Sequence, residues 1–542
     1  MLALLAVALA VPACRGGRRG TPPERWVPAD VRLAIVVPEA GRAARELAAL
    51  HATLSGFPGA GDLATLRGAL AAQLGFDPLD PDALADAGLD RRRGAALALT
   101  GRDASAPPLL VLPVKDAPKL ERLLARLARE RLGAETRTAE PHGATATVVF
   151  RSAPGAPAAL AYAVVDRTAL VAPGPSGPAT VAAAATLAPE RALPAAQGFL
   201  AAQAAIGADS AALAFVPAGS PLLAGRWAVR DGLALGVTAG AGRLRARLAV
   251  LLGAREPSFQ ALAAKGGRGG EAALRLMPDA AAVLTFDGDP AALGRKLVPL
   301  VAAPDRARLA ARGVELQRDL FDVLAPGAAV ALSLSPRLAL GELDEATARA
   351  DPLRVVELEA VLPLKPGATA AAERLAAALQ PPAPAHASRP RRPSPSSPAA
   401  ARSPRANDGR IATPSGEIAW RLEPDLGRLL LAGGAPGRLE ALEARLAGGG
   451  AAFAPPTAEA REALSGPLGG GVLDVQRLVA SVRALPDDAF GTGPSGFVVR
   501  SVVDRFLEPA ARLAAVSGSA QLAADALVVT VDVEAREGGD ER

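Results

Sequence analysis

The hydrophobic residues of this chain recur with two different periods, which separates predicted strands from predicted helices. Residues 30–37 form a short, mostly apolar run that stops at a proline, as a buried strand does before a turn. Residues 40–54 follow, with Leu47, Leu50 and Leu54 three and four positions apart, which is typical of one face of a helix. The folded part of the chain is therefore expected to begin with a strand and a helix.

The same pattern returns in the second half of the chain. The tetrapeptide Leu-Pro-Val-Lys at residues 112–115 is followed 250 positions later by Leu-Pro-Leu-Lys at 362–365, and Pro28 and Pro278 keep this offset. In each half the tetrapeptide ends a predicted strand and a predicted amphipathic helix follows it. The repetition indicates one long strand-helix unit written twice.

Other segments extend the parallel between the two halves. The predicted strands of the first half lie at 94–99, 109–114, 144–151, 160–165, 168–172, 233–237 and 244–252. Those of the second half lie at 280–286, 327–332, 355–364, 417–423, 428–432, 496–503 and 526–533. The predicted helices lie at 63–74, 81–87, 117–132 and 179–187, and at 290–300, 368–379 and 439–446. We expect an α+β fold of two tandem copies, each a largely antiparallel sheet with helices packed on it.

The composition sets limits on function. Half of the residues are apolar but only 3% are aromatic, which disfavours a surface that stacks sugars or bases on rings. The net charge of +5 comes from two segments, since residues 381–410 hold six arginines and one aspartate, and residues 15–25 hold four arginines and one glutamate. Acidic residues outnumber basic ones elsewhere, so no nucleic-acid partner is expected. Residues 381–410 are rich in Pro, Ser and Arg and are predicted to be a disordered insertion.

The start of the chain carries a candidate modification site. Residues 2–13 form an apolar run too short to span a bilayer, and Val-Pro-Ala precedes Cys14, the only cysteine. This arrangement resembles a bacterial lipoprotein signal, which implies cleavage before Cys14 and its diacylation. It departs from that pattern in Pro12 and in lacking a basic residue before the run, which a start codon upstream of Met1 would explain. An incidental cysteine is the alternative.

The resemblance to lipoproteins sets the expected location and boundaries. Arg15, rather than an aspartate, follows the cysteine, which in such proteins implies the outer membrane, facing the periplasm or the cell surface. The expected divisions are a signal peptide (1–13), a flexible tether (14–29), copy 1 (30–257), a hinge (258–270) and copy 2 (271–537). Membrane attachment would be through the acyl chains on Cys14.

Candidate catalytic chemistry is sparse. The three histidines, His51, His142 and His386, are not at metal-ligand spacing. Residues 491–496 fit G-x-G-x-x-G, but a turn is predicted before them and a strand after them, which is the wrong context for a dinucleotide site. The acidic pairs are predicted to be loop caps rather than a cation site: Asp77 with Asp80, Asp287 with Asp289, and Asp487 with Asp488.

These observations predict a non-enzymatic, membrane-anchored lipoprotein that acts as a binding or interaction module, with no cofactor, no metal and no catalytic residues. The expected partner is an envelope protein or an apolar ligand. The alternatives are a carrier or chaperone for lipid, and an enzyme with an unrecognised site. The layout is also similar to a family of uncharacterised bacterial extracytoplasmic proteins with duplicated strand-helix-strand units, a resemblance that implies no catalytic residues.

Overall fold

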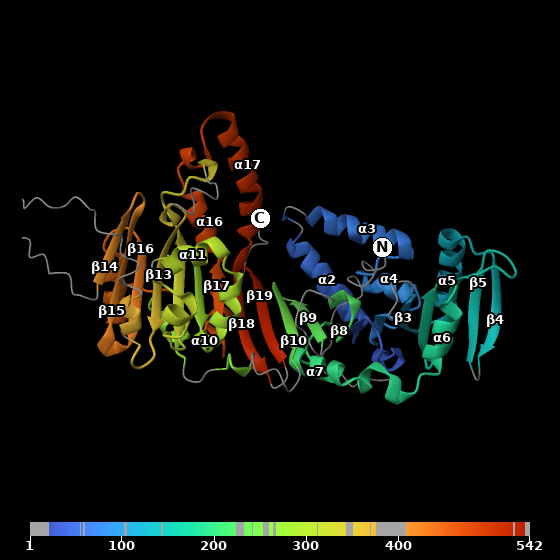
Figure 1. Ribbon diagram of the computed structural model, residues 1–542. Helices are drawn as coiled ribbons and strands as arrows, with labels where there is room; N and C mark the ends of the chain where they lie inside the picture. Colours follow the sequence, from blue (N-terminus) through green and yellow to red (C-terminus); the bar gives the residue numbers. More distant parts are fainter. Residues whose placement is uncertain are drawn as a thin grey trace, which may run out of the picture. The chain divides into compact units, whose positions relative to one another are not determined.

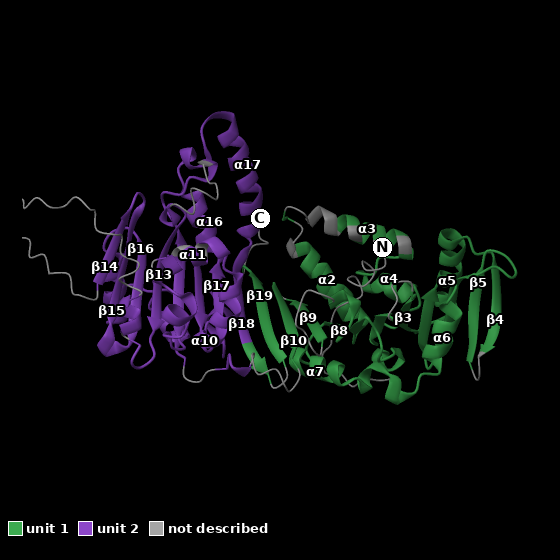
Figure 2. Cartoon of the chain, viewed as in Figure 1, with its two compact units in different colours: residues 1–256, 521–542 green, residues 257–520 purple. Residues whose placement is uncertain are grey.

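The computed structural model describes two compact units (Figure 2): Met1–Glu256 with Gln521–Arg542 as unit 1, and Pro257–Ala520 as unit 2. The residues that it does not describe are 1–20, 55, 58–59, 102–105, 143–144, 224–231, 241, 253–259, 264–266, 312, 343–350, 369, 375–407, 524–525 and 537–542. Among the described helices, none has the length and apolar character needed to cross a membrane.

Unit 1 is built on an antiparallel sheet in the order β4-β5-β6-β7-β3-β2-β1-β8-β9-β10-β19. Its strands are β1 (Leu33–Val37), β2 (Ala95–Leu99), β3 (Pro108–Pro113), β4 (Thr136–His142), β5 (Thr145–Arg151), β6 (Ala158–Val165), β7 (Thr168–Pro173), β8 (Ala212–Pro217), β9 (Gly232–Gly240), β10 (Arg243–Leu251) and β19 (Ala526–Ala535).

Side chains alternate between the two faces of this sheet, and apolar side chains point to both. Helices therefore cover both faces (Figure 1). In β6, Ala161 and Ala163 belong to the core that α6 and α7 cover, whereas Leu160 and Tyr162 belong to the core that α2, α4 and α5 cover. The helices are α2 (Ala40–Leu54), α3 (Ala60–Leu74), α4 (Pro81–Asp86), α5 (Ala117–Leu132), α6 (Gly177–Ala185) and α7 (Gln197–Ile206).

Unit 2 has an antiparallel sheet in the order β14-β15-β16-β13-β12-β11-β17-β18. Its strands are β11 (Ala282–Phe286), β12 (Ala328–Leu334), β13 (Val356–Pro363), β14 (Asp408–Thr413), β15 (Gly416–Glu423), β16 (Arg428–Gly434), β17 (Gly469–Asp474) and β18 (Leu513–Ala523). Its helices are α9 (Gly269–Ala273), α10 (Pro290–Leu297), α11 (Ala303–Ala311), α14 (Arg438–Leu446), α15 (Ala458–Ala463), α16 (Val475–Arg483) and α17 (Gly493–Ala510).

The strand order of unit 2 repeats that of unit 1. In unit 1 the order β5-β6-β7-β3-β2-β1-β8-β9 is matched in unit 2 by β14-β15-β16-β13-β12-β11-β17-β18. The predicted α+β class, with two copies of an antiparallel sheet and helices packed on it, is confirmed.

The repeated tetrapeptide makes the same backbone contacts in both units. Val114 bridges to Leu89 and its N–H donates to the Arg167 carbonyl, at 2.8 Å. Leu364 bridges to Leu324, and its N–H donates to the Gly427 carbonyl, at 2.7 Å. The tetrapeptide therefore fixes the exit of a central strand against a neighbouring turn, which explains its repetition without a role in chemistry.

The two units differ most in the connection that follows the strand beside β1 or β11. In unit 1, residues 218–231 join β8 to β9. In unit 2, residues 475–512 join β17 to β18 and hold α16 and α17. The predicted strand at 496–503 is therefore wrong, because Val499 and Val503 lie on one face of α17 and pack on a small core with Leu338 and Phe490. Packing against such a core stabilises the helix enough to outweigh the strand preference of β-branched residues.

The N-terminal tether is shorter than predicted. Of residues 14–29, those from 21 onward are described, and Trp26 and Val27 are buried in the main core of unit 1. The N–H of Leu193 donates to the Val27 carbonyl at 2.7 Å, so this part of the segment is folded. The predicted signal peptide (1–13) and residues 14–20 of the predicted tether lie outside the described residues.

Three further segments differ from the sequence-based expectation. Residues 136–142, for which the sequence predicts no strand, form β4. Of the predicted insertion 381–410, residues 381–407 lie outside the described residues, and its last three residues begin β14. The predicted hinge 258–270 is described only in part, and its end forms the start of α9.

The last strand pairs with unit 1. Sequence boundaries assigned residues 271–537 to copy 2, but β19 pairs along its length with β10, from Leu251 with Ala526 to Arg243 with Glu534. Order along the chain does not determine which sheet edge a strand covers, and β10 would otherwise present an unpaired edge.

Candidate functional site

The sequence-predicted candidates do not come together in the described structure. Cys14 and His386 lie outside the described residues, and so does the side chain of His142 at the end of β4. His51 lies in the last turn of α2, where its Nε2 atom is buried without a hydrogen-bond partner among the described residues. Within the described part of the chain, no group of three metal-ligating side chains exists.

The acidic pairs serve as helix caps and ion-pair partners. Asp80 accepts from the N–H of Asp82 at the start of α4, and Asp289 accepts from the N–H of Ala291 at the start of α10. Burial raises the pKa of Asp77, but hydrogen bonds from Arg67 outweigh this effect and lower the pKa below its ordinary value.

Two of the other acidic residues, Asp287 and Asp487, also have partners. Burial raises the pKa of Asp287, although the N–H of Gly269 donates to its carboxylate at 2.8 Å. Asp487 pairs with Arg500 at 2.8 Å. These contacts agree with structural roles for both carboxylates.

The glycine-rich segment 491–496 has a different context from the predicted one. A 3-10 helix (Asp487–Phe490) precedes it and α17 follows it, so the predicted strand after the glycines is wrong. Gly491 and Gly493 have φ angles of 104° and 68°, which form the turn into the helix. A dinucleotide site also needs a strand before the glycines, and in the described chain α16 and this 3-10 helix stand there instead.

Unit 1 contains a groove between α5 on one side and α4 with the segment that joins α3 to α4 on the other. We call it the α5 groove; its volume is about 630 Å³, and it is lined by Gly75, Phe76, Ala83, Asp86, Ala87, Lys119, Arg122, Leu123 and Arg126. The cations are three and four positions apart, so one face of α5 carries all of them. Leu123 and Ala87 are buried beneath them, which gives the groove an apolar floor and a cationic rim.

Unit 2 exposes several large apolar side chains on α17. Phe497, Val498, Val502 and Phe506 are 76%, 60%, 50% and 51% exposed, and we call them the α17 apolar surface. The helix is held on its other side, where Val499 and Val503 pack and Arg500 lies 4.5 Å from the centre of the Phe490 ring. Helix α17 therefore buries only part of its apolar face.

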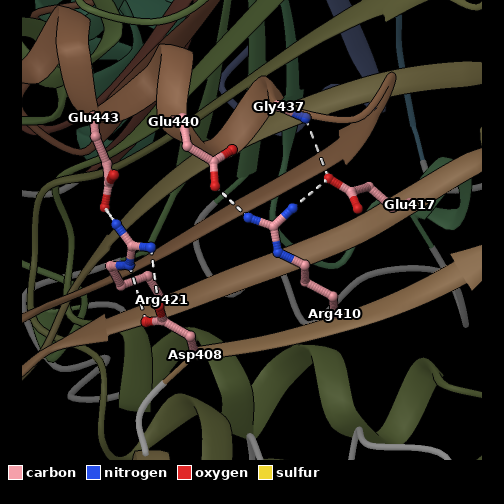
Figure 3. Close-up of polar contacts among 7 residues, drawn as sticks. All are labelled: Asp408, Arg410, Glu417, Arg421, Gly437, Glu440 and Glu443. Atoms are coloured by element: carbon pink, nitrogen blue, oxygen red, sulfur yellow. Dashed lines mark hydrogen bonds and ion pairs between the residues drawn. The ribbon is translucent and has the colours of Figure 1, made fainter. Parts of the chain in front are cut away.

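A charged network links α14 to the β14–β15 hairpin (Figure 3). Arg421 donates to both carboxylate oxygens of Asp408, at 2.9 Å each, and also to Glu443. Arg410 donates to Glu417 at 3.0 Å and also to Glu440. The hydrogen bond with Asp408 raises the pKa of Arg421. Since each carboxylate already binds an arginine, the network holds α14 on the sheet and offers no free ligand set.

Two further ion pairs beneath α14 are almost fully buried. Glu357 and Glu359 lie on the same face of β13, where Arg438 donates to Glu357 and Arg445 donates to Glu359 at 2.5 Å. Glu359 is 1% exposed, and burial raises its pKa despite the hydrogen bond from Arg445. Sequence reasoning missed these pairs, although two glutamates at alternate positions of an apolar strand are a signal that could have found them.

Comparisons with known proteins add little. No protein-family model matches the chain, and no curated protein matches it. Crystal form IV of TP0453 has a TM-score of 0.25 and 12% sequence identity, over 46% of this chain and 89% of that chain. Crystal form III of TP0453 has a TM-score of 0.24 and 11% identity, over 44% of this chain and 85% of that chain. Likenesses this weak carry no conclusion about fold or function.

Proposed function

We propose that the protein is a non-enzymatic binding module, anchored to the outer membrane by a lipidated Cys14, in which α17 binds a protein partner of the cell envelope. The observation that carries this proposal is the α17 apolar surface. Soluble domains rarely expose several large apolar side chains within three helical turns unless a partner covers them. A contact surface of this kind requires no catalytic group.

The position of α17 in the repeat supports a specific role. Two units with the same strand order need the same sheet and covering helices for stability, so a segment present in only one of them is not required by the fold. The connection that holds α17 is such a segment, since its counterpart in unit 1 spans only residues 218–231. Functional residues concentrate in such added connections on a rigid scaffold.

The charges on α17 favour a protein partner over a lipid surface. Helices that lie on membranes usually carry lysine and arginine on their polar face. In α17, Arg500 and Arg505 are balanced by Asp504 and Glu508. An apolar patch with a rim of mixed charge is typical of protein interfaces.

Site-directed photo-crosslinking in the native envelope tests the partner. A benzoylphenylalanine at position 502 of the full chain should give a protein adduct of one discrete mass, and Phe497→Asp with Phe506→Asp should abolish that adduct. The matched control is Leu426, an exposed leucine outside α17, which should give none. Equal adducts from positions 502 and 426, or adducts with lipid only, would contradict the proposal.

The membrane anchor is tested separately. Cys14→Ala should release the protein from sedimented membranes while a radiolabelled palmitate signal disappears from it. The same variant with the crosslinker at position 502 shows whether partner binding depends on the anchor. Continued sedimentation of Cys14→Ala with the membranes would refute attachment through Cys14.

A lipid carrier is the second candidate function, and the α5 groove is the observation that favours it. A groove with an apolar floor and charged groups at its edge is the usual form of a site for amphipathic molecules.

A further inference from the structure

The three cations of the α5 groove differ in what they contact. Arg126 donates to the Gly75 carbonyl at 3.3 Å, at the C-terminal end of α3. Lys119 lies 3.8 Å from Asp86, whose side chain is 86% exposed, so this pairing is weak. Arg122 has no hydrogen bond or ion pair with any residue in the described part of the chain.

Part of this arrangement is explained by the fold. Basic side chains stabilise the C-terminal carbonyls of a helix, and Arg126 and Arg131 do this for α3, since Arg131 donates to the Ala72 carbonyl at 2.6 Å. Capping accounts for neither Lys119 nor Arg122. Both extend from the same face of α5 into a groove whose one lining carboxylate is Asp86.

The floor of the groove determines what kind of anion fits. Phe76, Ala83, Ala87 and Leu123 line it, so a small hydrophilic anion would leave this apolar surface uncovered. A volume of 630 Å³ lies within the range of about 300–1,000 Å³ that is usual for small-molecule sites. Such a groove has room for one alkyl chain beside a headgroup.

We propose that the α5 groove binds a single-chain amphipathic anion, an alkyl carboxylate or alkyl phosphate, whose headgroup contacts Lys119 and Arg122 and whose chain lies along Phe76 and Leu123. Guanidinium and ammonium groups both bind carboxylates and phosphates through charge-assisted hydrogen bonds. The site lies within unit 1 and is independent of the proposed role of α17 in unit 2; the inference rests on the second candidate function, the lipid carrier, and names the class of ligand that its groove would take.

Titration calorimetry with the full-length protein tests the ligand class. Dodecanoate and dodecyl phosphate, each below its critical micelle concentration, should bind one per chain. Dodecyl trimethylammonium and dodecyl maltoside should bind at least tenfold more weakly. Affinity should rise by about fourfold for each fully buried methylene added between butanoate and dodecanoate, and by about twofold for each methylene that stays half exposed on the floor.

The variants separate the groove from general charge effects. Lys119→Gln with Arg122→Gln should weaken dodecanoate binding at least tenfold. Arg129→Gln, which removes an exposed arginine of α5 that does not line the groove, should leave binding within twofold. Circular dichroism should show the same thermal midpoint for all variants, since none of these side chains is buried.

Several outcomes would overturn the proposal. Equal binding by wild type and the double variant would place the ligand elsewhere, and equal competition by inorganic phosphate and dodecyl phosphate would show that the apolar floor takes no part. Phe497→Asp with Phe506→Asp, which alters α17, should leave dodecanoate binding unchanged. Failure of the groove can thus be distinguished from failure of the α17 interaction.

Discussion

Arg245 of β10 and Asp532 of β19, which are 287 positions apart, form a two-point ion pair: Nε donates to Oδ1 at 2.8 Å and Nη2 to Oδ2 at 3.1 Å. Arg243 also donates to Oδ1, at 3.0 Å. Asp532 is only 6% exposed, so both arginines bind a carboxylate that water barely reaches. This contact ties the last strand of the chain to the sheet of unit 1.

Asp532→Asn is expected to destabilise unit 1 by about 1–3 kcal/mol, because it removes the buried carboxylate charge to which both arginines donate. The measurement is urea unfolding of the full chain at pH 7. The matched control is Asp209→Asn, which removes the exposed partner of Arg247 on the same strand and should cost less than about 0.5 kcal/mol. Equal effects of the two variants would contradict a larger contribution of the buried Asp532 to stability than of the exposed Asp209.

The same residue predicts a pH dependence. Burial raises the pKa of Asp532, but the hydrogen bonds from Arg245 and Arg243 outweigh it and hold the pKa below its ordinary value. A lowered folded-state pKa adds stability that is present above the unfolded-state pKa and is lost as the pH falls through the folded-state pKa. The wild type should therefore lose more stability than Asp532→Asn below about pH 4. If the free energies of unfolding of the two proteins fell in parallel with pH, the result would argue against this ion pair.

Removal of one member of the buried Glu359–Arg445 pair should lower the free energy of unfolding strongly, whereas replacement of both members by apolar residues should lower it little. Arg445→Met alone is expected to destabilise unit 2 by about 3 kcal/mol, because it leaves a carboxylate buried without its main partner. Arg445→Met combined with Glu359→Leu should recover most of that loss. Urea unfolding of both variants measures the difference. A double variant less stable than the single one would show that the pair itself stabilises the fold.

The turns whose carbonyls accept hydrogen bonds from the repeated tetrapeptide have the same backbone conformation but different residues. Arg167 and Gly427 both have a φ angle of 60°, and their carbonyls accept from Val114 and Leu364. Gly427→Arg should cost about 1 kcal/mol, because residues with a Cβ are strained in this conformation. Arg167→Gly should change stability by less than about 0.5 kcal/mol, since relief of strain is offset by a freer unfolded chain. Thermal unfolding compares the two.

Two adjacent valines test the orientation of α17. Val502 is 50% exposed, whereas Val503 packs on the core that contains Phe490. Val502→Asp should change the free energy of unfolding by less than about 0.5 kcal/mol, and Val503→Asp should lower it by about 2 kcal/mol or more. The measurement is urea unfolding followed by circular dichroism. The reverse order of effects would mean that α17 buries its other face.

Much of the fold could be predicted because it depends on local periodicity. The apolar stripes at 40–54 and 117–132 predict helices at their observed bounds, because each stripe keeps helical spacing over its whole length. The strands at 109–114 and 428–432 were found from short apolar runs next to turns. The prediction of a strand at 496–503 is wrong. The valines there suit a strand, and their helical form depends on packing against Leu338 and Phe490.

The candidate sites could not be predicted, because they depend on which side chains remain uncovered. The sequence predicts a helix at 117–132 that packs on a sheet, and nothing local shows that a groove lies beside Lys119 and Arg122. Phe497 and Phe506 are apolar in sequence whether or not a neighbour covers them. Lipidation of Cys14 remains a prediction from the sequence.

The sequence by itself determined the repeat, the α+β class and most helices and strands, because periodicity and turn residues act over a few neighbouring positions. Only the tertiary structure decided that β19 covers the edge of β10, that Asp532 meets Arg245, and that α17 leaves its apolar surface open. These features depend on contacts between residues far apart in the chain, and their free energy comes from burial and charge pairing that no local pattern encodes.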